Sequence, residues 1–397
     1  MRAEGKKHLQ TDVLPACLSL QVRILGLNMG ITGLAVLWST ARDYLIYKPE
    51  VWTGEWIPVL VAFANFVVVT SVIIGASILL LFVLRMALNW EQTREEANDA
   101  EYAPVFCMGS IALMVIAGQV GYFIDKGFAE FLWCLAVSLH VLLIANWGGH
   151  IFKFVGAFFN CTGSGASDSD GWQWKYDHRT RQGRFSPAAG YNEQREPEPP
   201  NMAIFYPTYF VPPVGIAVAA LTCANAGTCE SGAPFFYFAV GAYIVLLPFI
   251  FVRAHFIDPP LNDTQENTYI VFADPPALLL NVWITVMGGS LYDPWTHILF
   301  AVMCIFLIAV IVRFIWKGTI FKPFLPSQAA WLFSSVMIMK AWVLYLTLFA
   351  ELESRALHWY QSCILWFVVL LITVLAGVIV ARYFHAVANG VKFTGGA

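Results

Sequence analysis

Lys340 is the residue of this sequence best placed to do chemistry, because it stands near the middle of a long apolar run, residues 324–351. An ammonium group at the centre of a bilayer costs roughly 2.5 to 3.5 kcal/mol even on an insertion-based scale, so something must compensate its charge. On a helix, Phe333 lies two turns earlier on nearly the same face, and Met337 lies between them. We interpret this face as one wall of a permeation path.

The positions of the carboxylates agree with this interpretation. The interiors of the apolar runs contain no Asp or Glu, and residues such as Asp274 and Glu351 stand at the edges of runs. The charge of Lys340 is then most simply stabilised by water in a pore or by a passing anion. Two alternatives are a lysine that is neutral when buried and a lysine that reaches Glu351. The same distribution counts against a proton-coupled carrier, which usually uses an intramembrane carboxylate.

The remaining reactive side chains form no catalytic or metal-binding pattern. The eight histidines include no pair at the helical spacing i, i+3 or i+4, and the eight cysteines lack the spacing of a metal site. His140, inside an apolar run, is expected to hydrogen-bond a neighbour rather than bind a ligand. No glycine-rich phosphate loop or Ser/His/Asp arrangement has a suitable scaffold. We therefore expect no enzyme activity, no metal, no cofactor and no nucleic-acid partner.

The elements that must position Lys340 and Phe333 are membrane helices. Of the 397 residues, 58% are hydrophobic and 12% are charged, against about 25% charged in soluble domains. Runs of about 20 apolar residues are long enough to span a bilayer. Such runs fall at about 22–40, 57–84, 104–122, 128–147, 207–225, 235–254, 275–291, 295–313, 326–350 and 360–381. The sequence therefore predicts an all-α polytopic membrane protein with ten transmembrane helices.

These helices form one predicted transmembrane domain at residues 22–386, with a cytoplasmic segment at 1–21 and a cytoplasmic tail at 387–397. One polar insert, at about 155–205, buries too little apolar area to fold alone, so we predict a mobile cytoplasmic loop.

The distribution of basic residues predicts the orientation. With both termini in the cytoplasm, 18 of the 23 Lys and Arg lie on the inner side, as the positive-inside rule requires. The four in outer loops are Arg42, Lys48, Lys126 and Arg355. We expect a multi-pass protein of the plasma (inner) membrane with cytoplasmic termini.

Glycine and proline alternate between the predicted helices. The odd helices contain 16 of these residues and the even helices contain 5. Such residues are tolerated where neighbouring helices or water satisfy the freed backbone groups. The pattern predicts five helical hairpins, with an inner ring of odd helices around a central pore and an outer ring of even helices. Close helix packing without a pore is the alternative.

Four stretches of the sequence resemble motifs of one known family. They are LNMGITGLA at 27–35, YPTYFVPPVGIAV at 206–218, DPPALLLNVW at 274–283 and SQAAWLF at 327–333. The family is the tellurite-resistance and C4-dicarboxylate transporter family, which includes the bacterial tellurite-resistance protein, fungal malate permeases and sulfite exporters, and the slow-type anion channels of plants. The likeness runs from about residue 24 to residue 385.

The resemblance implies ten helices, five inner and five outer, and a homotrimer with a pore in each protomer. Phe333 is similar in position to a phenylalanine that blocks the pore in the family, which implies an aromatic gate. With Lys340 and Met337 from the helical face described above, the predicted pore-lining residues are Asn28, Gly30, Phe210, Pro213, Gly215, Pro276 and Asn281. The chain differs from the family pattern at Ser334, where the family has proline, and at Asp274, where it has alanine; Lys340 is also outside that pattern.

The leading functional hypothesis is an anion channel or facilitator for small inorganic or organic anions, gated by Phe333. Lys340 would supply a fixed positive charge, aided by the positive ends of broken helices. The alternative is a coupled carrier or exporter of C4-dicarboxylate, sulfite or tellurite-type oxyanions. A structural or sensor protein without transport is the third class.

Two cysteines, Cys223 and Cys229, fall at the outer end of the fifth predicted helix, on the oxidising side of the membrane. We predict a disulfide between them, with two unpaired thiols as the alternative.

Alkylation tests this pairing. Oxidised protein, denatured without reductant and treated with a thiol-alkylating reagent, should remain unlabelled at Cys223 and Cys229, because a disulfide sulfur does not react. Peptide mass spectrometry reads the labelling, and a reduced sample is the control. Labelling of both residues in the oxidised sample would exclude the disulfide.

Overall fold

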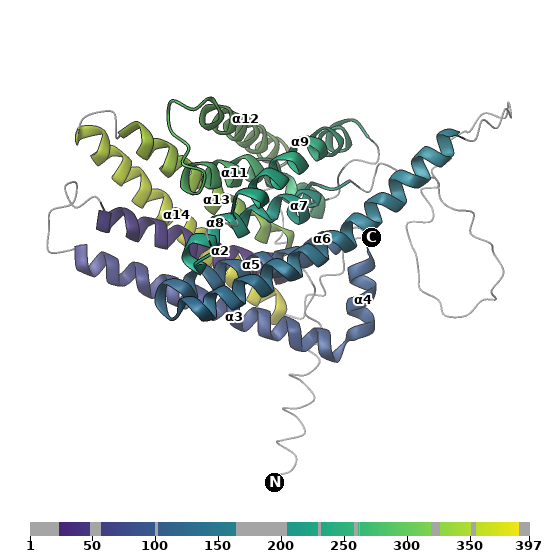
Figure 1. The fold of residues 1–397 in the computed structure, drawn as a ribbon, viewed down its shortest axis with the longest axis horizontal. Coiled ribbons are helices and arrows are strands. Elements are labelled where there is room, and N and C mark those ends of the chain that lie inside the picture. The colour runs from purple at the N-terminus through teal and green to yellow at the C-terminus, as the bar shows by residue number, and fades with distance from the viewer. Residues whose placement is uncertain are drawn as a thin grey trace, which may run out of the picture.

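A computed structural model describes residues 24–47, 57–99, 102–163, 205–228, 232–257, 261, 263–318, 326–350 and 355–388. Every regular element within these ranges is a helix. The predicted N-terminal segment 1–21, residues 164–204 of the polar insert and residues 389–397 of the tail lie outside the described residues. The helices run roughly side by side along one direction (Figure 1).

Nine helical segments in the described part of the chain are long and apolar enough to cross a membrane. They agree with nine of the ten predicted runs and make this a multi-pass membrane protein. They lie in α2 (Ile24–Tyr47), α3 (Ile57–Leu88), α5 (Ala103–Phe123), α6 (Lys126–Gly163), η2–α7–α8 (Pro207–Phe210, Val211–Gly215 and Ala217–Ala226), α9 (Gly232–Phe256), α12 (Pro294–Lys317), α13 (Ala329–Ala350) and α14 (Arg355–Ala388). Because α6 continues to Gly163, the predicted loop at 155–205 begins later than its composition indicated.

The seventh predicted run, 275–291, does not form one long helix. Its helix α11 spans only Asp274–Thr285, and α10 (Asp263–Asn267) and the 3-10 helix η4 (Thr268–Phe272) precede it. Two prolines in the first turn of α11 suit a helix start, where no N–H partner is needed. After α11, Gly288 has a φ of 73°, which breaks the helical path. The seventh segment is therefore a series of short helical pieces.

Burial separates the segments into two groups. The buried share of the span is 89% in α2, 89% in α5 and 83% in residues 207–226. It is only 22–28% in α3, α6, α9, α12 and α14. Helix α13 is intermediate at 50%, whereas residues 274–282 of α11 are all buried. The two buried and broken segments, η2–α7–α8 and α10–η4–α11, thus lie where protein can satisfy their irregular backbone.

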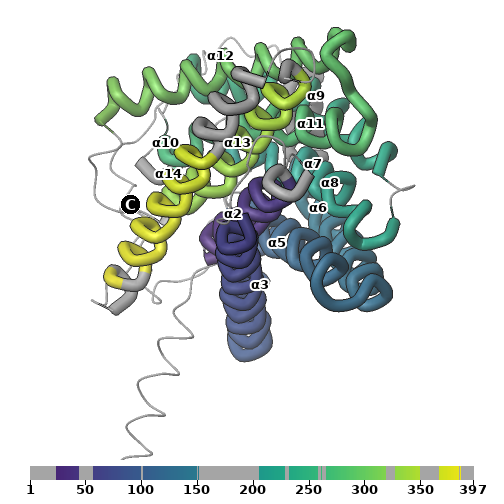
Figure 2. The backbone as a smooth tube through the Cα atoms, turned by 90° about the vertical axis from the view of Figure 1, so that its left-hand side faces the viewer, coloured from purple at the N-terminus to yellow at the C-terminus, as the bar shows by residue number. Residues whose placement is uncertain are grey.

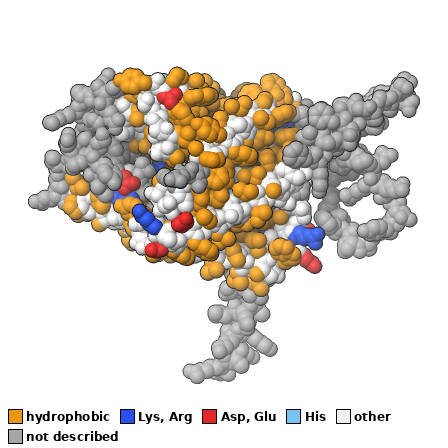
Figure 3. Space-filling view, in the orientation of Figure 1, with side chains coloured by type: hydrophobic (Ala, Val, Ile, Leu, Met, Phe, Trp, Pro, Cys, Tyr) orange, Lys and Arg blue, Asp and Glu red, His pale blue; other side chains and the backbone are white. Residues whose placement is uncertain are grey.

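The buried segments close into a ring. Helix α2 packs on α5, α5 on α8, α8 on α11, α11 on α13, and α13 on α2. Each also packs on the helix that follows it in the chain, namely α3, α6, α9, α12 and α14. Figure 2, which looks along the helices, shows α3, α12 and α14 at the periphery and α2 nearer the centre. The outer helices expose apolar side chains, and Figure 3 shows few charges on the visible face.

Contacts between α2 and α13 show their direction. A Cβ added at Gly26 would lie 3.8 Å from Ala329, one at Gly30 would lie 2.8 Å from Leu332, and one at Gly33 would lie 3.0 Å from Phe333. The contacts advance together along both helices, so α2 and α13 run in the same direction. The 2.8 Å approach also explains why position 30 carries glycine, since any side chain there would collide with Leu332.

A charged pair fixes the end of α3. Arg85, which is 1% exposed, binds both carboxylate oxygens of Glu96 at 2.7 and 2.6 Å. Glu96 belongs to the short helix α4 (Trp90–Asn98), so the pair holds α4 against the end of the bundle. Two parallel hydrogen bonds between charged groups give this contact a fixed geometry.

Removing one partner of this pair should destabilise the protein. Glu96→Gln leaves the buried Arg85 without its counter-charge, which costs about 3 to 5 kcal/mol when a buried pair is broken. The midpoint of thermal unfolding in detergent should fall clearly, whereas Glu95→Gln, at an exposed neighbour, should leave it unchanged. Equal midpoints for the two variants would contradict a structural role for the pair.

Candidate functional site

A small cavity lies inside the ring. Its volume is about 20 Å³, which is room for about one water molecule. All five buried segments contribute to its wall, through side chains that include Met29 of α2, Ile111 of α5, Val218 of α8, Leu278 of α11 and Phe333 of α13. A cavity with this lining lies where the five segments meet, which is where a path along the ring would have to pass.

Phe333 limits the size of this cavity. Its side chain is 2% exposed, and its ring packs on the open backbone face of Gly33. Phe210, on another side of the cavity, contacts Tyr243 and Phe272 with ring centroids 5.5 and 5.8 Å apart. Rings held in this way leave no space for a hydrated anion, so the ring of segments is closed at this level.

Asp274 also lines the cavity, which corrects its predicted place at the edge of a membrane span. The carboxyl group is 7% exposed, and its Oδ1 atom has no hydrogen-bond partner among the described residues. The hydroxyl group of Ser334 lies close enough to interact with the carboxyl group. The apolar run begins only after Asp274, but residues 265–273 before it are buried as well, so the carboxylate lies well within the segment.

Asp274 of α11 and Ser334 of α13 bring two segments of the ring together. They belong to segments 60 residues apart and lie in direct contact in the folded protein. Asp274 is in the first turn of α11, where the positive end of the helix dipole faces it. The structure thus places a carboxyl group, a hydroxyl group and the ring of Phe333 at one level of the ring.

Several hydrogen bonds hold the seventh segment, α10–η4–α11, against α13 and the 3-10 helix η6 (Pro326–Gln328) that precedes it. The side-chain amide of Asn281 donates to the carbonyl of Met337 at 3.0 Å, and both residues are fully buried. The indole N–H of Trp331 donates to the carbonyl of Asn267 at 2.7 Å, and the amide of Asn267 donates to the hydroxyl of Ser327 at 3.1 Å. These bonds fix Phe333 relative to Asp274. The bonded residues Trp331 and Met337 lie on either side of Phe333 in the sequence, and Asn267 and Asn281 lie on either side of Asp274.

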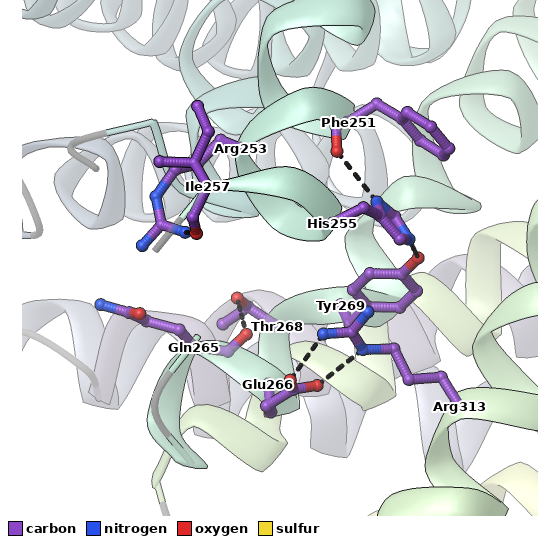
Figure 4. Close-up of polar contacts among 9 residues, drawn as sticks. All are labelled: Phe251, Arg253, His255, Ile257, Gln265, Glu266, Thr268, Tyr269 and Arg313. Atoms are coloured by element: carbon purple, nitrogen blue, oxygen red, sulfur yellow. Dashed lines mark hydrogen bonds and ion pairs between the residues drawn. The ribbon is translucent and has the colours of Figure 1, made fainter. Parts of the chain in front are cut away.

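A polar network at the start of the seventh segment anchors it to the outer helices (Figure 4). The guanidinium group of Arg313 binds both carboxylate oxygens of Glu266 at 2.8 and 2.6 Å, and lies 4.3 Å from the ring centroid of Tyr269. The Tyr269 hydroxyl lies 2.6 Å from Nε2 of His255, whose Nδ1 lies 2.9 Å from the carbonyl of Phe251. The network joins α9, α10, η4 and α12.

His140 supports the fifth segment from outside the ring. Its Nε2 lies 2.8 Å from the carbonyl of Pro212, and its Nδ1 lies 2.7 Å from the hydroxyl of Ser110. His140 is therefore hydrogen-bonded to neighbours, as predicted. The bond to Pro212 lies at the short helix α7, directly behind Gly215.

Lys340 lies away from the cavity, towards the end of α2. It is 9% exposed, and the charge of Asp43 acts on it favourably. Asp43 itself pairs with Arg42 at 2.8 Å. Lys340 is two helical turns beyond Phe333, about 10 Å along α13. Glu351, the other predicted partner, lies outside the described residues.

The remaining predicted pore residues divide into two groups. Phe210 and Gly215 line the cavity together with Phe333. The residues that do not line it are Lys340, Met337, Asn28, Gly30, Pro213, Pro276 and Asn281. Their pore-lining role beyond this cavity stays a prediction.

The motif in α2 explains why neighbours of the predicted residues line the cavity. The side chain of Asn28 faces α3, with Oδ1 3.1 Å from the Cβ position of Gly75, and Gly30 faces α13. Met29, between them, faces the cavity. Adjacent helical residues point about 100° apart. A sequence motif therefore indicates the depth of a site along the helix, but it does not show which of the neighbouring side chains faces the cavity.

Comparison with known proteins places this architecture. The chain matches the sequence profile of a family described as voltage-dependent anion channel over residues 19–380. No curated protein matches the chain closely enough to count as a relative. The matched range includes all five segments of the ring. It confirms the family that the sequence motifs resemble. This multi-pass membrane protein therefore belongs to the voltage-dependent anion channel family, within the tellurite-resistance and C4-dicarboxylate transporter group.

Proposed function

We propose that this protein is an anion channel or facilitator in which small anions pass along the axis of the ring. The observation that carries the proposal is the cavity, to which all five buried segments contribute and which Phe333 restricts. A cavity that all five segments line suits a path that opens when one side chain moves. Phe333 is the gate of this path.

The positive charge for selectivity comes from Lys340. In its position two turns from Phe333 it faces the neighbourhood of Asp43 and Arg42, where α2 ends. A buried ammonium raises the local concentration of anions before they reach the gate. The positive ends of the broken segments add to this field.

The membrane context completes the proposal. The positive-inside rule favours the plasma (inner) membrane with cytoplasmic termini, and family membership favours a homotrimer with one path in each protomer. The exposed apolar surface of the outer helices would contact lipid and, between protomers, other copies of the chain.

A coupled carrier of C4-dicarboxylate, sulfite or tellurite-type oxyanions is the second candidate. Asp274 favours it, because an intramembrane carboxyl group is the usual means of coupling to protons. Flux into liposomes with a panel of anions separates the two functions. Steady currents that reverse at the anion equilibrium potential indicate a channel, and flux that requires a proton gradient indicates a carrier.

Replacement of the gate should open the path. Phe333→Ala removes the ring that restricts the cavity, so anion conductance should rise several-fold at equal expression. Leu332→Ala is the matched control, because it removes an equally buried side chain that faces Gly30 instead of the cavity. Conductance no higher than wild type in Phe333→Ala would assign Phe333 to core packing.

Replacement of Lys340 separates a wet path from packing. Lys340→Gln should reduce anion flux and anion-over-cation selectivity with little loss of stability, and Lys340→Glu should reduce both further by repelling anions. Lys317→Gln, at an exposed lysine of α12, is the control. Reversal potentials in a salt gradient measure selectivity. A stability loss of about 3 to 5 kcal/mol with unchanged selectivity would instead identify a buried charge pair.

A further inference from the structure

We propose that Asp274 is a proton-binding site in the gate, and that a bound proton admits the anion to the central cavity. This inference rests on the proposed anion path and adds the proton as a second ligand of the protein. It is carried by the position of the carboxyl group on the cavity wall, beside Phe333 and in contact with Ser334.

The lining of the cavity makes the charge of Asp274 decisive. Every other lining residue is apolar or glycine, so the carboxyl group is the only titratable group on this wall among the described residues. An ionised carboxylate in such a low-dielectric space repels an anion at close range, whereas a neutral one does not. The same side chain therefore sets whether the narrowest level of the path accepts an anion.

The hydrogen bonding of Asp274 leaves one oxygen for this role. Ser334 lies on one side of the carboxyl group. The residue is only 7% exposed, and its Oδ1 atom has no hydrogen-bond partner among the described residues. A protonated carboxyl group has one O–H donor, which an ionised one lacks. Proton binding thus replaces a repelling oxygen by a donor that can bind an anion in the cavity.

The charged and titratable groups of the surrounding elements are engaged elsewhere. On α13, Lys340 is six residues beyond Ser334 and is acted on by Asp43. On α12, Arg313 pairs with Glu266, and Tyr269 of η4 hydrogen-bonds His255 of α9. His140 of α6, behind Gly215, bonds Ser110 and Pro212. On α9 and α8, such groups include Tyr243, which packs on Phe210, and Cys223, whose sulfur lies 3.0 Å from the carbonyl oxygen of Ala220.

None of these groups is placed to neutralise Asp274 in the way that a paired lysine or arginine would. Its charge is therefore set by the proton concentration that reaches the cavity and by the Ser334 hydroxyl.

The test is the pH profile of anion flux in liposomes that contain the full-length protein, with chloride and nitrate as probes. Wild-type flux should rise at least tenfold as the pH falls. Asp274→Asn, an isosteric neutral side chain, should give the high flux at every pH. Asp125→Asn, at an exposed carboxylate that caps α6, should keep the wild-type profile. Identical pH profiles in wild type and Asp274→Asn, with both conducting, would overturn the proposal.

A second variant and a second measurement keep the inference separate from the proposed function. Ser334→Ala should shift the midpoint of the profile to higher pH, because the lost hydroxyl stabilised the ionised form, and should leave the low-pH plateau unchanged. Infrared difference spectra between high and low pH should show a carboxyl C=O band that Asp274→Asn lacks. If Phe333→Ala conducts no anion at any pH, the proposed function fails, but the carboxyl C=O band still tests whether Asp274 binds a proton. Absence of this band in the wild-type spectra would overturn the proton site.

Discussion

The structure depends on one constraint: backbone N–H and C=O groups inside a bilayer need partners within the protein. Two of the five buried segments are broken, at Pro212 and Pro213 and again at Pro275 and Pro276. Such segments are tolerated only inside a ring of other helices, and α3, α6, α9, α12 and α14 provide that cover. His140 shows the requirement locally, since its ring nitrogen satisfies the carbonyl of Pro212 at a break. Continuous outer helices are thus what allow irregular inner ones.

The irregular segments in turn bring polar groups to the axis. A continuous helix through residues 263–285 would place its polar side chains along one stripe, whereas the short pieces α10, η4 and α11 can be oriented separately. The Arg313–Glu266 pair and the Trp331–Asn267 bond fix the first pieces to α12 and α13. Helix α11 then begins at the level of the cavity, with Asp274 in its first turn. Breaking the helix is therefore what makes a polar position available next to Phe333.

The sequence predicted the levels of the fold better than its side-chain directions. Hydropathy identified nine spans correctly, because a membrane span requires a long apolar run and little else produces one. The same measure could not place the seventh segment, since residues 269–273 are apolar but Asp274 separates them from the main run. Asn28 and Gly30 were predicted to line the path, yet Met29 between them lines the cavity, because motif positions carry no rotation angle. Asp274 was predicted to lie at the edge of a span because the apolar run is interrupted there. Its position on the cavity wall, beside Ser334, follows only from the packing of α11 against α13.

Two ionisable side chains, Lys340 and Asp274, lie at different depths of the helix pair α11 and α13. Ser334, which contacts Asp274, and Lys340 are six residues apart on α13, or about 9 Å along its axis. On the proposed path, an anion that enters from the end of α2 meets the attraction of Lys340 before it meets Phe333 and Asp274. In this proposal, separate groups govern the accumulation of the anion and its admission to the cavity, so one can vary without the other. A single charge at the narrowest level could not do both, because a cation that binds the anion tightly there would also slow its release.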